Sequence, residues 1–253
     1  MTFKKAKAIT ACGCFYDLED PVAFIRDVGK ALVHDGVFVA QLMCLRNMLN
    51  VGDIGNLCHE HLEFYTLKSL RSLYANAGLE IFDVETNDVN GQSYRIWARH
   101  YNSPVETPPG ACERVSQVDR DEENLGEGWY WKEFERRLEG NRERVCAFLQ
   151  NAVQRGKTVW GYGASTKGNV LLQYYGLDRS LVSAIADKSS EKWGKYTVGT
   201  GIPIVSEEEF RRANPDFALV LPYAFLEEFE VREKAWRDGG GAWIVPLPYL
   251  RVI

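Results

Sequence analysis

Thr158-Val159-Trp160-Gly161-Tyr162-Gly163-Ala164-Ser165-Thr166-Lys167-Gly168-Asn169 is the stretch that decides the fold of the C-terminal half of this chain. It begins as a short apolar strand, turns at two glycines, and continues into a helix through Leu172 and Tyr175. Further strands are expected at 182–186, 217–221 and 243–245, with a helix near 226–236. Because strands and helices alternate at this spacing, residues 129–253 are predicted to form a doubly wound, Rossmann-like α/β domain.

The first hundred residues have a similar α/β pattern. A helix is expected to begin at Asp20-Pro21, since proline is tolerated in the first turn, and a second helix to be capped by Thr66 and to end at Gly78. The expected strands are 6–12, 37–43, 80–84 and 93–100, the last two joined by a turn at Asn90-Gly91.

Between these regions, residues 104–128 are interpreted as a linker. They contain Pro104, the Pro108-Pro109-Gly110 run and an acidic run at 119–123, with little apolar periodicity. A long charged helix is expected from about Trp129 to Arg155. The predicted organisation is therefore one domain over 1–103, a linker over 104–128 and a second domain over 129–253.

Composition excludes several classes of function. The chain has 253 residues, of which 45% are hydrophobic and 26% charged, and its net charge is -5. This balance is typical of a soluble globular protein and argues against a nucleic-acid surface, which needs clustered basic residues. No apolar run approaches the roughly 20 residues of a membrane span, and no signal-peptide core follows Met1. A cytoplasmic protein with no membrane or nucleic-acid partner is expected.

The six cysteines are scattered, and no CxxC pair is present. Four adjacent residues, Cys58 to His61, could not wrap one tetrahedral ion without strain, and the HExxH spacing of helical zinc sites is absent. Free thiols and no bound metal are therefore expected.

The densest chemistry lies in Cys58-His59-Glu60-His61-Leu62-Glu63-Phe64-Tyr65, which contains two of the four histidines. In an extended backbone His59 and His61 would share one face and Glu60 would take the other. A neutral imidazole can accept a proton at physiological pH, and a nearby carboxylate raises its basicity. General-base chemistry is one interpretation, and a solvated polar loop is the other.

The Gly161-Tyr162-Gly163 turn is the second candidate site. Glycines let the backbone approach a phosphate, the helix N-terminus offers N–H donors, and Lys167 could add a positive charge. The third glycine of the dinucleotide fingerprint is missing, since Thr166 occupies its position, but Asp187 ends the next strand, where a ribose-binding acid would lie. A purely structural turn is the alternative. The segment from Asn90 to Arg95 offers further donors, although a simple hairpin explains it equally well by chemistry alone.

Two motifs in different domains resemble one family. Asn56 to Tyr65 is similar to the signature of the sugar C-methyltransferases, which include enzymes that methylate C3 of nucleotide-linked 4-keto-deoxysugars. The Gly161–Asn169 run, Gly194-Lys195-Tyr196-Thr197 and Ile244-Val245-Pro246-Leu247-Pro248 resemble that family's C-terminal domain. Residues 8–100 look like the second half of a class I S-adenosylmethionine-dependent methyltransferase domain. The chain departs from the family at two positions. The family typically has tyrosine where this chain has Cys58, and a histidine occurs in the family where this chain has Asp17.

The resemblance implies methyl transfer to carbon, in which a base removes the C3 proton and the resulting enolate attacks the sulfonium methyl of S-adenosylmethionine. His61 is then the base and Glu60 its supporting carboxylate, with His59 a weaker candidate. Residues implied to lie near the nucleotide-linked sugar are Cys58, Tyr65, Asn90, Gly91, Ser93, Gly161, Tyr162, Gly163, Lys167 and Lys195. Those implied near the cofactor are Ala11, Cys12 and Phe15.

Relative to the family, the N-terminal zinc-binding domain and the first methyltransferase strands are missing ahead of Ala6, which leaves most of the cofactor site absent. A truncated or split form is therefore expected, with the remaining half supplied by a separate chain or the exposed sheet edge used for self-association. Such a chain is expected not to bind S-adenosylmethionine tightly alone. Two other functions stay open: a non-catalytic nucleotide-sugar binding module, and an NAD-dependent oxidoreductase built on Gly161-Tyr162-Gly163 and Asp187.

Overall fold

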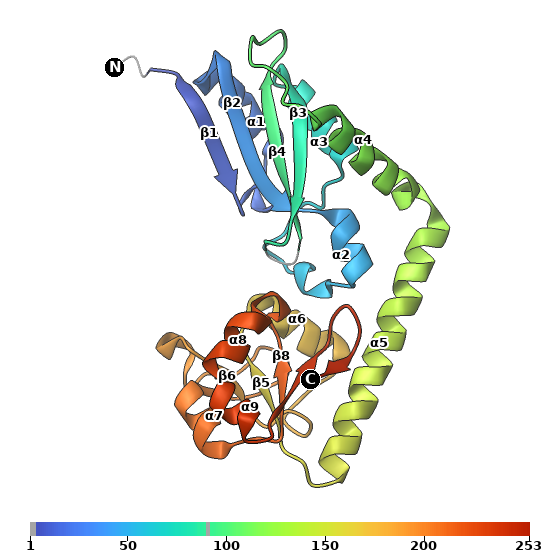
Figure 1. The fold of residues 1–253 in the computed structure, drawn as a ribbon, viewed down its shortest axis with the longest axis vertical. Helices are drawn as coiled ribbons and strands as arrows, with labels where there is room; N and C mark the ends of the chain where they lie inside the picture. The colour runs from blue at the N-terminus through green and yellow to red at the C-terminus, as the bar shows by residue number, and fades with distance from the viewer. Residues whose placement is uncertain (1–3, 90–91) are drawn as a thin grey trace. The chain divides into compact units, whose positions relative to one another are not determined.

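The computed structural model describes residues 4–89 and 92–253. The chain forms two compact units, whose strands and helices are labelled in Figure 1. The first unit consists of the chain up to Leu49 together with His59–Trp131, and the second of Asn50–Cys58 together with Lys132–Ile253. Asn50–Cys58 therefore belongs to the same compact unit as the C-terminal half of the chain.

The described elements up to residue 126 are β1 (Ala6–Cys12), η1 (Phe15–Asp17), α1 (Pro21–Ala31), β2 (Leu32–Met43), α2 (Leu45–Val51), η2 (Ile54–Asn56), α3 (Leu67–Ala75), β3 (Leu79–Asn87), β4 (Ser93–His100), α4 (Ala111–Glu122) and η3 (Glu123–Gly126). The sheet of the first unit has the order β1-β2-β4-β3, in which β1 and β2 are parallel and β4 is antiparallel to both of its neighbours. The chain thus forms the mixed α/β sheet expected of a partial methyltransferase domain.

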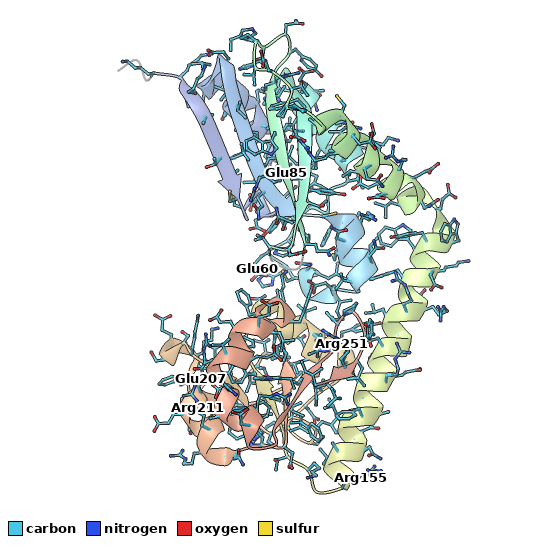
Figure 2. All side chains as sticks on the ribbon, in the orientation of Figure 1. Glu60, Glu85, Arg155, Glu207, Arg211 and Arg251 are labelled. Atoms are coloured by element: carbon cyan, nitrogen blue, oxygen red, sulfur yellow. The ribbon has the colours of Figure 1, made fainter. Side chains whose placement is uncertain are left out.

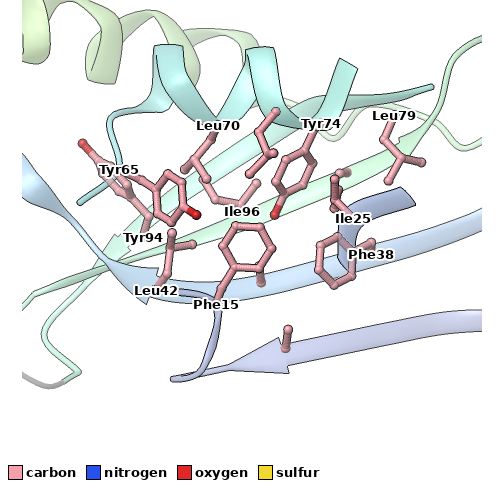
Figure 3. Packing of buried hydrophobic residues seen from close by; sticks show 14 of the residues in the cluster. Phe15, Ile25, Phe38, Leu42, Tyr65, Leu70, Tyr74, Leu79, Tyr94 and Ile96 are labelled. Carbon is pink, nitrogen blue, oxygen red and sulfur yellow. The ribbon is translucent and has the colours of Figure 1, made fainter. Parts of the chain in front are cut away.

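The core of the first unit joins α1, α3 and the sheet. Ile25 of α1 and Tyr74 of α3 are fully buried against Phe38 of β2, and Figure 3 shows the aromatic rings of this cluster close together. Both helices begin at the predicted capping residues. The Asp20 carboxylate accepts a hydrogen bond from the amide of Ala23 at 2.8 Å, and the Thr66 hydroxyl accepts one from the amide of Ser69 at 3.1 Å. Local capping chemistry therefore defines where these helices start.

The structure differs from the expected linker over residues 104–128. Most of its second half is helix α4, which packs on β3 and buries Ala111, Val118 and Glu122. Arg114 holds this helix to Asp83 of β3 through two hydrogen bonds, at 2.9 and 2.5 Å. The helix has few buried apolar residues and is fixed by polar contacts, which is why apolar periodicity does not reveal it.

The described elements of the C-terminal half are α5 (Gly128–Gln154), β5 (Val159–Tyr162), α6 (Thr166–Tyr175), β6 (Ile185–Asp187), η4 (Ser190–Lys192), β7 (Ile204–Ser206), α7 (Glu207–Ala213), β8 (Phe217–Val220), η5 (Tyr223–Phe225), α8 (Leu226–Arg232), α9 (Lys234–Asp238), β9 (Ala242–Val245) and β10 (Arg251–Val252). Their sheet has the order β10-β9-β8-β5-β6-β7, parallel except for β10. The order reverses at β5, as a doubly wound sheet requires.

Each face of this second sheet has its own core. Leu149 of α5 and Leu172 of α6 pack with Val159 on one face, whereas Phe210 of α7 and Trp236 of α9 pack with Tyr162 on the other. Helices thus cover both faces of the sheet. This confirms the predicted doubly wound, Rossmann-like fold of the C-terminal domain.

Candidate functional site

The His59–His61 segment of the first unit lies in the connection that follows β2. Residues 59 and 60 form a turn, so the side chains do not alternate as they would in an extended strand. His59 is largely exposed, and its Nδ1 lies 3.4 Å from Oε2 of Glu60. His61 is half-buried and meets the ring of Tyr16 edge-on, with the ring centroids 4.6 Å apart.

Backbone hydrogen bonds fix the His61 loop to the segment after β1. The amides of Leu62 and Glu63 donate to the carbonyl of Tyr16 at 2.9 and 3.1 Å. Tyr16 lies in η1, just beyond the carboxyl end of β1, and the His61 loop follows the carboxyl end of β2. The loop therefore meets the edge of the sheet where ligands bind in parallel α/β folds.

The two remaining histidines have a different environment. His34 Nε2 lies 3.1 Å from the carbonyl of Asn102, and His100 Nε2 lies 3.3 Å from the carbonyl of Leu32. Their rings stack at 6.0 Å. These contacts are structural, which leaves His59 and His61 as the histidines available for chemistry in the first unit.

Other residues expected near the sugar lie in varied surroundings. Tyr65 is buried against Phe15, and its hydroxyl has no hydrogen-bond partner among the described residues. Burial raises the pKa of Tyr65 to about 12. Ser93 is buried and donates to the carbonyl of Val89 at 2.8 Å, Cys58 is half-buried, and Asn90 and Gly91 lie outside the described residues.

The three residues expected near the cofactor do not form a site for S-adenosylmethionine by themselves. Ala11 and Phe15 are buried in the core of the first unit, and Phe15 packs on the rings of Phe24, Tyr65 and Tyr74. Figure 3 shows Phe15 within this cluster. Cys12 is exposed. The side chains of Ala11 and Phe15 offer no hydrogen-bonding group to the ribose or amino-acid part of the cofactor, and the Cys12 thiol is only a weak donor.

The second unit contains a pocket of about 240 Å³ at the carboxyl ends of β5, β6 and β8. Its floor includes the Gly163-Ala164-Ser165 turn, and its apolar wall is formed by Pro222, Phe225 and Phe229. Charged residues complete the lining: Asp187, Lys188, Lys192, Glu207, Glu228 and Arg232. The pocket lies at the reversal of strand order, the usual ligand site of a doubly wound sheet.

Asp187 organises one side of this pocket. Its two oxygens accept the amides of Ala164 and Ser189, each at 2.8 Å, and the ammonium of Lys192 at 3.1 Å. Lys192 also donates to the carbonyl of Ala164 at 2.7 Å. The carboxylate that could have held a ribose therefore already binds three protein donors and fixes the turn after β5.

Three glycines in and after β5 have no room for a side chain. A side chain at Gly161 would come within 2.8 Å of Ile185, and one at Gly163, where φ is +82°, within 2.6 Å of Pro222. A side chain at Gly168 would lie 2.5 Å from Leu221. Gly168 thus provides the close helix–strand approach that the dinucleotide fingerprint assigns to its third glycine, at a different spacing.

A charged network lies beside the pocket. The Tyr162 hydroxyl donates to the buried Glu233 at 2.6 Å, and burial raises the pKa of Tyr162. Arg211 donates to the same carboxylate and approaches Glu207 at 3.4 Å, two residues that Figure 2 shows on α7. Arg232 donates to Glu207 at 2.7 Å and also to Glu228. The pocket therefore combines paired charges with an aromatic wall.

Lys167 and Lys195 are not among the residues that line this pocket. The ammonium of Lys167 lies 3.7 Å from Oδ2 of Asp53, and Lys195 is exposed in the 193–203 loop. The basic residues at the pocket are Lys188, Lys192 and Arg232. Sequence reasoning missed them because they come from loops and helices far from the glycine turn.

No group of three or more histidine, cysteine, aspartate or glutamate side chains among the described residues could hold a metal ion. None of the described helices is long and apolar enough to span a bilayer.

Comparison with known proteins places this architecture in a family. Residues 88–248 match the family described as the C-methyltransferase C-terminal domain. Over 248 residues the chain is 32% identical to the C-methyltransferase NovU of Streptomyces niveus, a match that covers 98% of this chain and 59% of NovU. The chain thus spans about three fifths of the length of this relative.

Proposed function

This chain belongs to the C-methyltransferase family, and from that membership we propose that it acts in S-adenosylmethionine-dependent C-methylation of a nucleotide-linked keto-sugar. His61 is the base. The observation that carries this proposal is the attachment of the His61 loop to Tyr16, where the connections after the parallel strands β1 and β2 meet. The carboxyl edge of parallel strands is where such folds bind ligands.

The chemistry assigned to the chain's own residues is proton removal. The ketone at C4 of the sugar acidifies the C3 proton, which passes to a ring nitrogen of His61. The C3–H electron pair becomes a C3–C4 π bond while the carbonyl π pair moves onto the C4 oxygen, which gives an enolate. The family implies S-adenosylmethionine as the methyl donor. His61 is half-buried, and histidine is the side chain that most often serves as a general base. Glu60, next to it in sequence, is the carboxylate that we propose supports the base.

We propose that the pocket of the second unit takes the nucleotide part of the substrate. Phe225, about half exposed at 49%, offers a ring face to a base, and Lys188, Lys192 and Arg232 offer charge to the diphosphate. The carboxylates of Glu207 and Glu228 in the same lining can accept hydroxyl groups of a ribose. In this assignment the glycine turn still lies near the nucleotide, as expected from the sequence. The lysine that contacts the diphosphate is Lys192 and not Lys167.

Deuterium exchange at C3 tests the role of His61 without requiring methyl transfer. The protein is incubated in D2O with dTDP-4-keto-6-deoxyglucose, and loss of the C3 proton signal is followed by NMR. We expect the chain to accelerate exchange and His61→Ala to slow it by about 10²-fold or more, the usual contribution of a general base. His34→Ala is the matched control, because His34 is an exposed histidine bonded to a backbone carbonyl.

The outcomes separate the candidate functions. Exchange by His61→Ala at the parent rate would exclude His61 as the base. Binding of the nucleotide sugar without any accelerated exchange would indicate a binding module. An NAD-dependent oxidoreductase is less well supported, because Asp187 is already occupied by three protein donors.

A further inference from the structure

We propose that Asp53 is a positioning residue for the proposed base: it fastens the segment that leads into His59–His61 to two turns that line the pocket of the second unit. The inference rests on the proposed function of His61 and adds a residue to which nothing in the sequence motifs gives a role.

Asp53 is a buried carboxylate with three partners. It is 2% exposed, and its Oδ2 accepts the Asn56 amide group at 3.0 Å and the Tyr223 hydroxyl at 3.1 Å. The Lys167 ammonium lies 3.7 Å from the same oxygen. Burial raises the pKa of Asp53, while Lys167 and Tyr223 act in the opposite direction.

The segment around Asp53 is held tightly on the second unit. Ile54 is buried in the same core as helices α5 and α6, and Arg137 of α5 donates to the carbonyl of Asn50 at 3.1 Å. A side chain at Gly55 would come within 2.7 Å of Lys167. The backbone of this segment therefore lies directly against the first turn of α6.

The partners of Asp53 come from the turns that form the pocket. Lys167 is two residues after Ser165, and Tyr223 directly follows Pro222; both Ser165 and Pro222 line the pocket. One turn follows β5 and the other follows β8. Asp53 therefore binds the segment that precedes His59–His61 to the same two turns that we propose contact the nucleotide.

The His59–His61 loop directly follows the segment that Asp53 holds. On one side, η2 ends at Asn56, which donates to Asp53; on the other, Leu62 is bonded to the carbonyl of Tyr16. The five residues 57–61 connect these two attachments. Loss of the Asp53 attachment would release one end of the loop that carries His61.

The energetic cost of burying Asp53 also points to a positioning role. A buried charge pair adds little net stability, because desolvation offsets the attraction between the charges. A well-packed apolar residue could dock Ile54 and Gly55 equally well. A buried carboxylate that accepts from two side chains and pairs with a third instead fixes the direction of the segment, which is what a catalytic base requires.

The test compares Asp53→Ala with the unchanged 253-residue chain in two measurements. The first is amide hydrogen exchange of peptides that cover Leu57–Tyr65, which we expect to become about tenfold faster in the variant, whereas peptides of β5 and β8 keep their rates. The second is C3–H exchange of dTDP-4-keto-6-deoxyglucose. Its maximal rate should fall by up to about 10²-fold, as expected for a displaced base, with dTDP affinity changed less than about twofold.

Further variants make the result specific. Asp53→Asn keeps an acceptor for Tyr223 and should restore most of the C3-exchange rate, and Tyr223→Phe removes one donor at little risk to folding. Asp216→Ala is the matched control: Asp216 binds Lys157 and Thr158 before the amino ends of β5 and β8, at the opposite edge of the sheet. It should leave both measurements unchanged.

Unchanged amide exchange at 57–65 in Asp53→Ala and Tyr223→Phe would overturn the inference, as would equal loss of dTDP affinity and C3-exchange rate. If the unchanged chain shows no C3 exchange, the proposed function fails. The amide measurement alone then decides whether Asp53 holds the loop.

Discussion

The strongest test of the pocket geometry is replacement of Asp187. In the structure this carboxylate is 7% exposed and accepts from the Ala164 and Ser189 amides and from Lys192. Asparagine at this position keeps one oxygen but presents an NH2 group to a donor, and it removes the charge beside Lys192. The Asp187→Asn variant therefore loses at least one buried hydrogen bond to a charged acceptor and the ion pair.

The expected cost follows from those contacts. Hydrogen bonds to charged groups contribute about 1.5–3 kcal/mol each, and a buried donor left without an acceptor costs a further ~1–3 kcal/mol. We therefore expect the free energy of unfolding of Asp187→Asn to fall by roughly 2–4 kcal/mol. Urea unfolding followed by tryptophan fluorescence, without ligand, measures this quantity.

Asp178→Asn serves as the control. Asp178 also accepts a backbone amide two residues ahead, that of Ser180 at 2.8 Å, but it is exposed and lies outside the pocket. Its replacement should cost less than about 1 kcal/mol, as is usual on the surface. If Asp187→Asn keeps full stability but loses a thermal shift that NAD gives the unchanged chain, Asp187 is a ribose-binding acid and our reasoning is wrong.

Two further predictions concern stability. Glu122→Ala should lower the free energy of unfolding by about 2–4 kcal/mol, because two buried donors lose their acceptor. These donors are the Tyr94 hydroxyl and the Leu67 amide, which lie 2.8 and 2.7 Å from the Glu122 oxygens. A cost near zero in urea unfolding would mean that α4 is not docked as described. The Lys157 ammonium and the Thr158 donors lower the pKa of Asp216 from 3.8 to about 2. Because the folded-state pKa is depressed, this stabilisation is present above pH 3.8 and is lost as the pH falls toward about 2; unfolding measured across this range should be less pH-dependent in Asp216→Asn, and an unchanged pH dependence would contradict the assignment.

Features set by local chemistry could be predicted from the sequence. Asp20 and Thr66 each cap a helix where the pattern places one, because a cap needs only a hydroxyl or carboxylate and the next few amides. The strand, turn and helix around Gly161 and Gly163 are also local. The doubly wound sheet follows from the alternation of such units, which is why the fold of the C-terminal domain was predictable.

Features held by polar contacts between distant residues were not predictable. Helix α4 lies in a proline-rich and acidic region, and its buried side includes the carboxylate of Glu122, which an apolar pattern cannot indicate. The basic side of the pocket has the same origin. Lys192 reaches Asp187 only because the loop after β6 folds back, and Arg232 comes from α8, over 60 residues after the glycine turn.

The His59–His61 motif shows why a signature can be recognised in a sequence without its geometry being known. In an extended backbone both histidines would lie on one face, but residues 59 and 60 form a turn in the structure. The segment before this turn is held by Asp53, which contacts Asn56 and, more than 100 residues away, Lys167 and Tyr223. After the turn, the amide of Leu62 donates to the carbonyl of Tyr16. Contacts between residues so distant in the sequence cannot be predicted from the propensities of the motif itself. The residues that decide how His61 is presented therefore lie outside the motif, which is where substitutions should separate substrate binding from proton removal.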